Sequence, residues 1–484
     1  MTTRRAALIG LAAAGAAGGA RAAAPAAGPV FAPEQVRADF AAMKAGLESG
    51  AYDLWAFTPR TVMDAAWARA EAAIVRPLSL LEVRTHFQRW AALARLGHAR
   101  VDPPFDAWGA YRAAGGRGFP LDVRIVKGRV FVAADRSGLD AVRPGDEITA
   151  LAGEPMARWL KRTGRNVSAE TDYMLWSLLE YDLPLYLWLE QGPVIAWDME
   201  LRREGRTVRV RLPARTRTEM AEAAKAEPSG PPPGPAREAR MIGEVAYLKP
   251  GAFFNIEART EAEGWDVTGF RKFTDEAFAG FEAAGARRLL IDLRGNPGGD
   301  SSFSDLVTGR IADRPYRFVS DFRVKVSPEA MRSNAERIAA DPVAAGAVSQ
   351  QYAELYARAK PGERARFEVP LSQPAERRFP GKAFLLVDRQ SYSNTVAVAA
   401  TAQDYRFGTI LGEETSDHAT TYGAMERFAL PETGISVGFP KARLVRPNGD
   451  LRPRGVVPDV VVASPIVATA EDRMLRDALA VVRA

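Results

Sequence analysis

The stretch AFLLVDRQSYSNTVAVAATAQDYRFGTILGEETSDHATTY, residues 383–422, decides the fold. It opens with a continuous apolar run, as expected of a buried parallel strand, and passes through a polar turn into a helix of Val, Ala and Thr. Ser393 stands at that junction, beside N–H groups that have no partner inside the helix. Those N–H groups and the helix dipole favour negative charge. The position predicts either a helix cap or the nucleophile of an acyl-transfer enzyme.

A second stretch, RRLLIDLRGNPGGDSS at residues 287–302, also runs from an apolar strand into a polar turn, here rich in glycine. Together the two stretches resemble the S41 serine peptidases, the family of C-terminal processing peptidases and tricorn core proteases. The resemblance covers the second half of the chain strongly and the first half loosely. The residues that carry it are, in chain order, Asp292, Arg294, Asn296, Gly298 and Gly299; Ser391-Tyr392-Ser393-Asn394; Gln403-Asp404-Tyr405; Gly412-Glu413-Glu414-Thr415; and Gly455, Pro458 and Asp459.

The resemblance implies an endopeptidase that forms an acyl-enzyme on Ser393. The oxyanion would meet the backbone N–H of Asn394 and an N–H from the Gly298-Gly299 turn. It also implies a ClpP/crotonase-like catalytic domain at residues 241–484. Alternation of strands and helices in that half independently predicts a mixed, largely parallel sheet with helices on its faces.

The general base is open between two histidines. C-terminal processing peptidases place a lysine 25 residues after the serine, and this chain has His418 there. His98 follows a helix expected at residues 80–96, where tricorn-like relatives carry a histidine, and we favour it. Either imidazole suits the task, since its ordinary pKa of ~6.5 is close to working pH.

The acid that orients the base is also open. Residues 451–454 are Leu-Arg-Pro-Arg, so the glutamate that tricorn-like members carry near the final Gly455 motif has no counterpart. Glu413, Glu414 and Asp417 are the candidates.

Residues 1–28 resemble a targeting segment. Arg4-Arg5 forms a charged start, an Ala/Gly-rich apolar core follows, and Ala20-Arg21-Ala22 fits a small-x-small cleavage site. The arginine pair is typical of a twin-arginine signal. We expect an exported protein, periplasmic or secreted.

The rest of the first half predicts two domains and a linker. Residues 29–114 show helical spacing of apolar residues, including a capping box from Ser79 to Glu82 and a stop at Gly97. Residues 115–220 are strand-rich, and AVRPGDEI at 141–148 resembles PDZ domains, which bind peptides as an added strand. Residues 116–119 are a candidate carboxylate-binding loop within this PDZ-like domain. Residues 221–240 predict a Pro-rich linker.

Composition narrows the function further. The 484 residues are 47% hydrophobic and 26% charged, as in ordinary multidomain globular proteins. The net charge of +6 comes without a run of basic residues, so we expect a peptide or protein substrate and no nucleic acid. Without cysteine the chain has no thiol nucleophile and no disulfide, and we expect neither metal nor cofactor. We also expect no membrane span in the mature chain; the oligomeric state is not predicted.

Two other functions fit the same pattern. One is a catalytically idle S41-fold protein that binds peptides or apolar ligands. The other is an esterase that uses the same serine.

Overall fold

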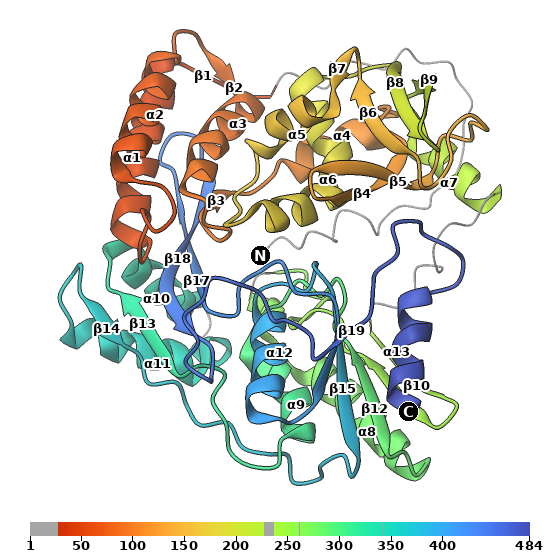
Figure 1. The fold of residues 1–484 in the computed structure, drawn as a ribbon. Coiled ribbons are helices and arrows are strands. Elements are labelled where there is room, and N and C mark those ends of the chain that lie inside the picture. The colour runs from red at the N-terminus through yellow and green to blue at the C-terminus, as the bar shows by residue number, and fades with distance from the viewer. Residues whose placement is uncertain (1–27, 227–236, 261, 341) are drawn as a thin grey trace.

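The computed structural model describes residues 28–226, 237–260, 262–340 and 342–484 (Figure 1). The targeting segment at 1–27 and the Pro-rich run at 227–236 lie outside the described residues.

The second half of the chain builds a six-stranded mixed sheet. Its strand order is β10-β11-β12-β15-β16-β19, with β10 antiparallel and the other neighbours parallel. Parallel strands need both faces covered, and here α8, α9 and α12 pack on one face while α13 packs on the other. The expected mixed-sheet α/β domain is confirmed. The elements are β10 (Glu238–Ile242), β11 (Val245–Lys249), α8 (Thr268–Ala283), β12 (Arg288–Asp292), α9 (Ser301–Ile311), β15 (Lys382–Val387), α12 (Asn394–Tyr405), β16 (Thr409–Gly412), β19 (Val460–Val461) and α13 (Arg473–Arg483).

A second, antiparallel sheet has the order β14-β13-β18-β17, and β3 pairs with β18. Strands β17 and β18, late in the chain, belong to this sheet and not to the parallel one. Figure 1 shows β17 and β18 beside α1 and β3, and the N-terminal helices share one hydrophobic core with this sheet. The elements are α1 (Pro33–Gly50), α2 (Arg60–Ala72), α3 (Leu80–Ala91), β3 (Arg100–Val101), β13 (Asp321–Lys325), α10 (Pro328–Ala340), α11 (Pro342–Arg358), β14 (Arg364–Arg366), β17 (Thr421–Ala429) and β18 (Ser436–Val445).

A third sheet is antiparallel, with the order β4-β5-β6-β8-β9 and β7 beside β6. Helices α5 and α6 contribute to its hydrophobic core. The elements are α4 (Phe105–Ala113), β4 (Leu121–Val126), β5 (Arg129–Asp135), β6 (Glu147–Leu151), β7 (Glu154–Pro155), α5 (Met156–Gly164), α6 (Asp172–Gln191), β8 (Ala196–Arg203), β9 (Arg206–Pro213) and α7 (Arg217–Ala226). Short elements complete the described chain: β1 (Val30–Phe31), β2 (Leu78–Ser79), and 3-10 turns at Ala92–Ala94 and Ala262–Trp265.

The candidate carboxylate loop at 116–119 is closed by its own hydrogen bonds. Gly116 N–H donates to Tyr111 O, Arg117 N–H to Tyr111 Oη, and Gly118 N–H to Arg215 O, at 2.9 to 3.0 Å. Three of its donors are therefore engaged, and the sequence interpretation of this loop is wrong.

Element boundaries differ from expectation at the end of α3 and at the linker. The capping box of Ser79 and Glu82 forms, but α3 ends at Ala91, and Arg95 rather than Gly97 takes the left-handed conformation, with φ 55°. The last helix is capped by Asp472, whose carboxylate accepts from Leu475 N–H. The linker is shorter than expected, because α7 extends to Ala226 and β10 begins at Glu238.

Candidate active site

Ser393 occupies a strained turn between β15 and α12. It is the N-cap residue of α12, with φ 55° and ψ −124°, a conformation that non-glycine residues rarely adopt. Its side chain makes no capping hydrogen bond, so the helix-cap interpretation is wrong. Backbone strain of this kind persists only where the surroundings hold it.

Three hydrogen bonds hold the turn. Ser393 N–H donates to Asp417 Oδ2 at 2.7 Å, Tyr392 N–H donates to Asn296 O at 2.9 Å, and the Ser391 hydroxyl donates to Leu293 O at 2.9 Å. The last two acceptors lie after strand β12: Leu293 follows it directly, and Asn296 belongs to its Gly-rich turn. The two stretches that resemble the S41 pattern are therefore in direct contact.

The Gly298-Gly299 turn lies against the start of α12. A Cβ added at Gly298 would lie 2.7 Å from Asn394 N and 2.9 Å from Ser393 Cβ, and its φ is +86°, so only glycine fits. The N–H of Gly298 donates to Asn296 Oδ1 at 3.0 Å. Gly299 and Phe253 are paired in an isolated β-bridge. The hydrogen bonds of this bridge are made by the residues on either side of Gly299: Phe253 N–H donates to Gly298 O, and Asp300 N–H donates to Phe253 O. The N–H of Gly299 takes no part in that bridge.

His98 is brought to the same place from the first half of the chain. It follows α3 and precedes β3, and it is buried. Its ring stacks on the ring of Tyr392 with 5.3 Å between centroids and 30° between planes. The base candidate therefore contacts the residue directly before Ser393.

His418 lies in the loop after β16 and is linked to the Ser393 turn through Asp417. Its N–H donates to Asp417 Oδ1 at 2.9 Å, so one carboxylate holds the backbones of His418 and Ser393 together. The imidazole lies near Phe57, with 6.5 Å between ring centroids. Burial lowers the pKa of His418 to about 4, against an opposing effect of Glu414.

Two of the three acid candidates are bound by arginines. Arg124 contacts both oxygens of Glu413 at 2.8 and 2.9 Å, and Arg454 contacts both oxygens of Glu414 at 3.0 and 3.2 Å. Asp417 is different, because it is fully buried and accepts from the N–H groups of the site. Burial raises the pKa of Asp417 to about 6, and the two N–H bonds oppose that rise.

A buried charge network joins the third sheet to the nucleophile loop. Arg389, four residues before Ser393, donates to Ile125 O at 2.9 Å and to Glu180 Oε1 at 3.0 Å. Arg124 completes the network by binding Glu180 and Glu413. Two arginines and two glutamates balance in charge, and they fix α6 and β4 against the loop that carries the serine.

Glu170 is a buried acid of the site that the sequence analysis missed. Its Oε1 accepts from Gly97 N–H at 2.9 Å, beside His98. It stands directly before Thr171, the N-cap of α6, and in sequence an acid there indicates only a helix start. No local signal could place it at the turn of His98, 73 positions away along the chain.

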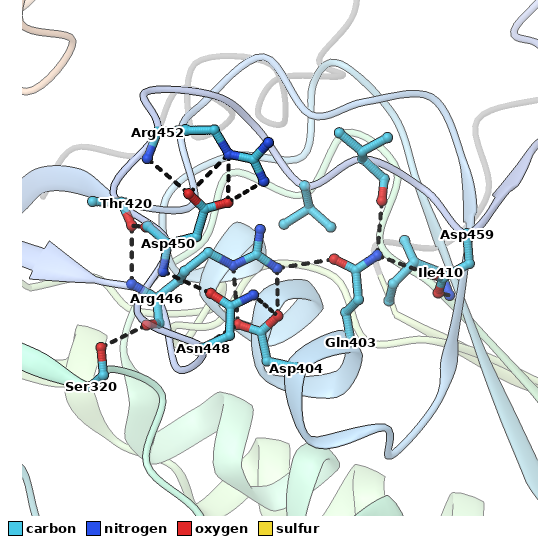
Figure 2. Close-up of polar contacts among 12 residues, drawn as sticks. Ser320, Gln403, Asp404, Ile410, Thr420, Arg446, Asn448, Asp450, Arg452 and Asp459 are labelled. Carbon is cyan, nitrogen blue, oxygen red and sulfur yellow. Dashed lines mark hydrogen bonds and ion pairs between the residues drawn. The ribbon is translucent and has the colours of Figure 1, made fainter.

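The remaining motif residues are structural. Arg294 binds Asp292 at 2.6 Å and Asp472 at 2.7 Å, which ties α13 to the parallel sheet. At the far end of α12, Gln403 donates to Asp459 Oδ1 at 2.9 Å, and Asp459 Oδ2 accepts from Ile410 N–H (Figure 2).

An open polar cavity of about 320 Å³ adjoins this second group, lined by Gln403, Asp404, Arg446, Asn448, Asp450, Arg452, Arg454, Gly455 and Val457. Ten residues of helix, about 15 Å, separate Ser393 from Gln403. The cavity is therefore distinct from the serine site.

Two absences in the described part of the chain concern metal ions and membranes. Among the described residues, no group of three His, Asp or Glu side chains is placed to hold a metal ion. None of the helices described here is long and apolar enough to cross a membrane.

Comparisons with known proteins agree with this geometry. Residues 254–462 match the family model "Peptidase family S41", so this segment of the chain is an S41 serine peptidase domain. It is therefore a serine-type hydrolase that acts on peptides or proteins. No curated protein matches the sequence.

Solved structures share the fold over nearly the whole chain. Mature CPAF complexed with lactacystin is 15% identical, covers 93% of this chain and 97% of its own, and has a TM-score of 0.63. Mature CPAF alone is also 15% identical, covers 93% of this chain and 96% of its own, and has a TM-score of 0.62. The photosystem II D1 C-terminal processing protease, 16% identical, covers 88% and 92% with a TM-score of 0.43.

Proposed function

We propose that the chain is an exported endopeptidase in which Ser393 is the nucleophile and His98 is the general base. The observation that carries the proposal is the strained turn of Ser393 with the ring of His98 stacked on the adjacent Tyr392. A serine that does not cap its helix and stands at the helix N-terminus is placed for attack and for oxyanion stabilisation.

The pKa of His418 argues against it as the general base. An efficient general base has a pKa near the operating pH. Burial lowers the pKa of His418 to about 4, so its imidazole is neutral at pH 7 but a weak base. Its backbone already serves the site by sharing Asp417 with Ser393.

The proposed reaction has two steps. Ser393 Oγ attacks the peptide carbonyl carbon while its proton passes to His98, and the imidazolium then protonates the leaving amine as the C–N bond breaks. Water hydrolyses the resulting ester with His98 again as base. The oxyanion accepts from Asn394 N–H and Gly299 N–H, because Gly298 N–H is engaged by Asn296. Loss of one such donor typically costs ~3 kcal/mol of transition-state stabilisation.

The third sheet, residues 115–220, is proposed to be a PDZ-like module that takes a peptide as an added strand. Its antiparallel strands with α5 and α6 support this assignment. At Ile125 the outer edge of β4 is occupied by Glu180 and Arg389, which leaves β9 as the edge for a peptide. Export rests on the targeting segment at residues 1–28.

A fluorophosphonate probe tests the catalytic proposal. We expect one adduct per chain on wild type, located on Ser393 by peptide mass spectrometry, and none on Ser393→Ala. Ser302→Ala is the matched control, since this exposed serine starts the neighbouring helix α9, and it should react like wild type. If folded wild type does not react and instead binds apolar ligands or peptides, the protein is a catalytically idle binding protein and not a peptidase. If it cleaves esters but no peptide library, the esterase replaces it.

A further inference from the structure

Glu170 is a buried acid with half of its carboxylate unused. Its side chain is 4% exposed, and Oε1 accepts from Gly97 N–H at 2.9 Å. In the described part of the chain, Oε2 has no hydrogen-bond partner. A buried carboxylate without full hydrogen bonding is costly, so its position calls for a physical reason.

The position of Glu170 brings it to the nucleophile turn as well as to the base. A Cβ placed on Gly97 would lie 3.1 Å from Glu170 Oε2 and 2.9 Å from Tyr392 Oη. Tyr392 is the residue whose ring stacks on His98 and which directly precedes Ser393. The nearest atom to that Cβ would be Met174 Cε, at 2.4 Å. Gly97 is therefore explained by the close packing of Met174, Tyr392 and Glu170 around it and not by the end of α3.

Asp417 holds the backbone of the Ser393 turn in the way that Glu170 holds the backbone before His98. Its carboxylate holds Ser393 N–H, as the carboxylate of Glu170 holds Gly97 N–H. One acid thus fixes the turn of the nucleophile, and the other fixes the turn of the base.

The two carboxyls also interact electrostatically. Burial raises the pKa of Glu170 to about 8, with the charge of Asp417 as the next cause. Arg95 opposes the rise, and its guanidinium also donates to Glu170 O at 2.9 Å. Two carboxyls that repel in a buried site ionise one after the other, so at neutral pH the pair keeps one proton. The Tyr392 hydroxyl lies near Glu170, and the Arg100 guanidinium donates to Gly97 O at 3.3 Å.

We infer that Glu170 is a positioning residue that, together with Asp417, joins the Gly97–His98 turn to the Tyr392–Ser393 turn. The inference rests on the proposed roles of His98 and Ser393. Glu170 would take the place of the orienting acid that residues 451–454 lack. This acid comes from the start of α6 and not from the catalytic half of the chain.

The pair makes a prediction about pH. Above about pH 8 both carboxyls are charged, and their repulsion separates the two turns. Glu170→Gln removes that charge, while its amide oxygen still accepts from Gly97 N–H. The alkaline loss of Ser393 reactivity should therefore be present in wild type and absent in Glu170→Gln.

The test uses the full chain and three variants: Glu170→Gln, Glu170→Ala and the control Glu190→Gln. Glu190 is at the other end of α6, where its side chain is 5% exposed and binds Arg89 and Asn166 away from the site. Hydrogen exchange by mass spectrometry follows the peptides that cover residues 95–99 and 391–395. Fluorophosphonate labelling from pH 6 to 9 follows Ser393.

We expect Glu170→Ala to speed exchange in both peptides and to slow labelling about 10- to 100-fold, as small misplacements of reacting groups do. Glu170→Gln should keep the wild-type exchange and lose only the alkaline decline. Glu190→Gln should change neither. Faster exchange at 95–99 alone, or an unchanged alkaline limb in Glu170→Gln, would overturn the inference. If wild type does not react with the probe, the proposed function fails, and the hydrogen-exchange data alone test whether Glu170 joins the two turns. If Glu170→Ala does not fold, the pH profile of Glu170→Gln tests the inference instead.

Discussion

Ser393 N–H and Asp417 Oδ2 are 2.7 Å apart, and this hydrogen bond fixes a strained serine to a fully buried acid 24 residues later in the chain. The same carboxylate accepts from His418 N–H, so the loop after β16 and the start of α12 move as one unit. The geometry of the Ser393 turn is therefore set by long-range contacts.

Asp417→Asn tests that bond. The amide keeps one oxygen and turns an NH2 group toward one of two N–H donors, which leaves a buried donor unsatisfied. We expect a loss of about 1 to 3 kcal/mol in unfolding free energy and a slower reaction at Ser393. Urea denaturation and probe labelling measure the two effects. Asp313→Asn, an exposed surface acid, is the control and should change neither.

Gly298→Ala tests the turn that faces the serine. An alanine there must adopt φ +86° and place its Cβ 2.7 Å from Asn394 N. We expect a stability loss of at least about 1 kcal/mol and labelling below detection, since the oxyanion donors are displaced. Gly280→Ala in α8 is the control; it meets nothing within 4 Å and should stabilise the chain by up to about 1 kcal/mol. Normal labelling of Gly298→Ala would contradict the proposed oxyanion site.

Arg389→Ala tests the link between the third sheet and the nucleophile loop. The change leaves Glu180 and Glu413 buried with one arginine between them, and breaking a buried pair typically costs about 3 to 5 kcal/mol. Arg211→Ala breaks an exposed pair with Asp198 and should cost under about 1 kcal/mol. Urea unfolding distinguishes the two. Equal effects would show that the network does not hold the sheet in place.

Glu170 also predicts how stability depends on pH. Its pKa is about 8 in the folded chain against the ordinary 4.5, so between these values folding must bind a proton. Stability from this group is complete below pH 4.5 and falls as the pH rises toward 8. The melting temperature of wild type should therefore fall relative to Glu170→Gln between pH 5.5 and 7.5. If the melting temperatures of wild type and Glu170→Gln changed with pH in the same way, the proton shared by Glu170 and Asp417 would be refuted.

Much of the catalytic half could be predicted from local pattern. The apolar runs at 289–293 and 383–387 are strands of the parallel sheet, because continuous apolar segments between helices are typical of strands buried on both faces. The Gly-rich turn and the turn of Ser393 meet because these strands are neighbours. That adjacency brings Gly298 to Asn394.

Other features depend on contacts between residues far apart in the sequence, which local patterns do not predict. The pairing of β3 with β18 joins residues more than 300 positions apart, so nothing near either strand predicts it. Gly97 was predicted as a helix stop, and the structure explains it by its approach to Glu170 and Tyr392. Glu170 was missed for the same reason, since its function lies in a contact and not in a motif.

The most direct measurement of the central claim compares the fluorophosphonate labelling rates of His98→Ala and His418→Ala at pH 7, with circular dichroism to verify folding. The account predicts a fall of at least about 100-fold in His98→Ala, because general-base assistance contributes about 10²- to 10⁴-fold, and a fall of less than about tenfold in His418→Ala. The reverse order, or undiminished labelling of a folded His98→Ala, would contradict it.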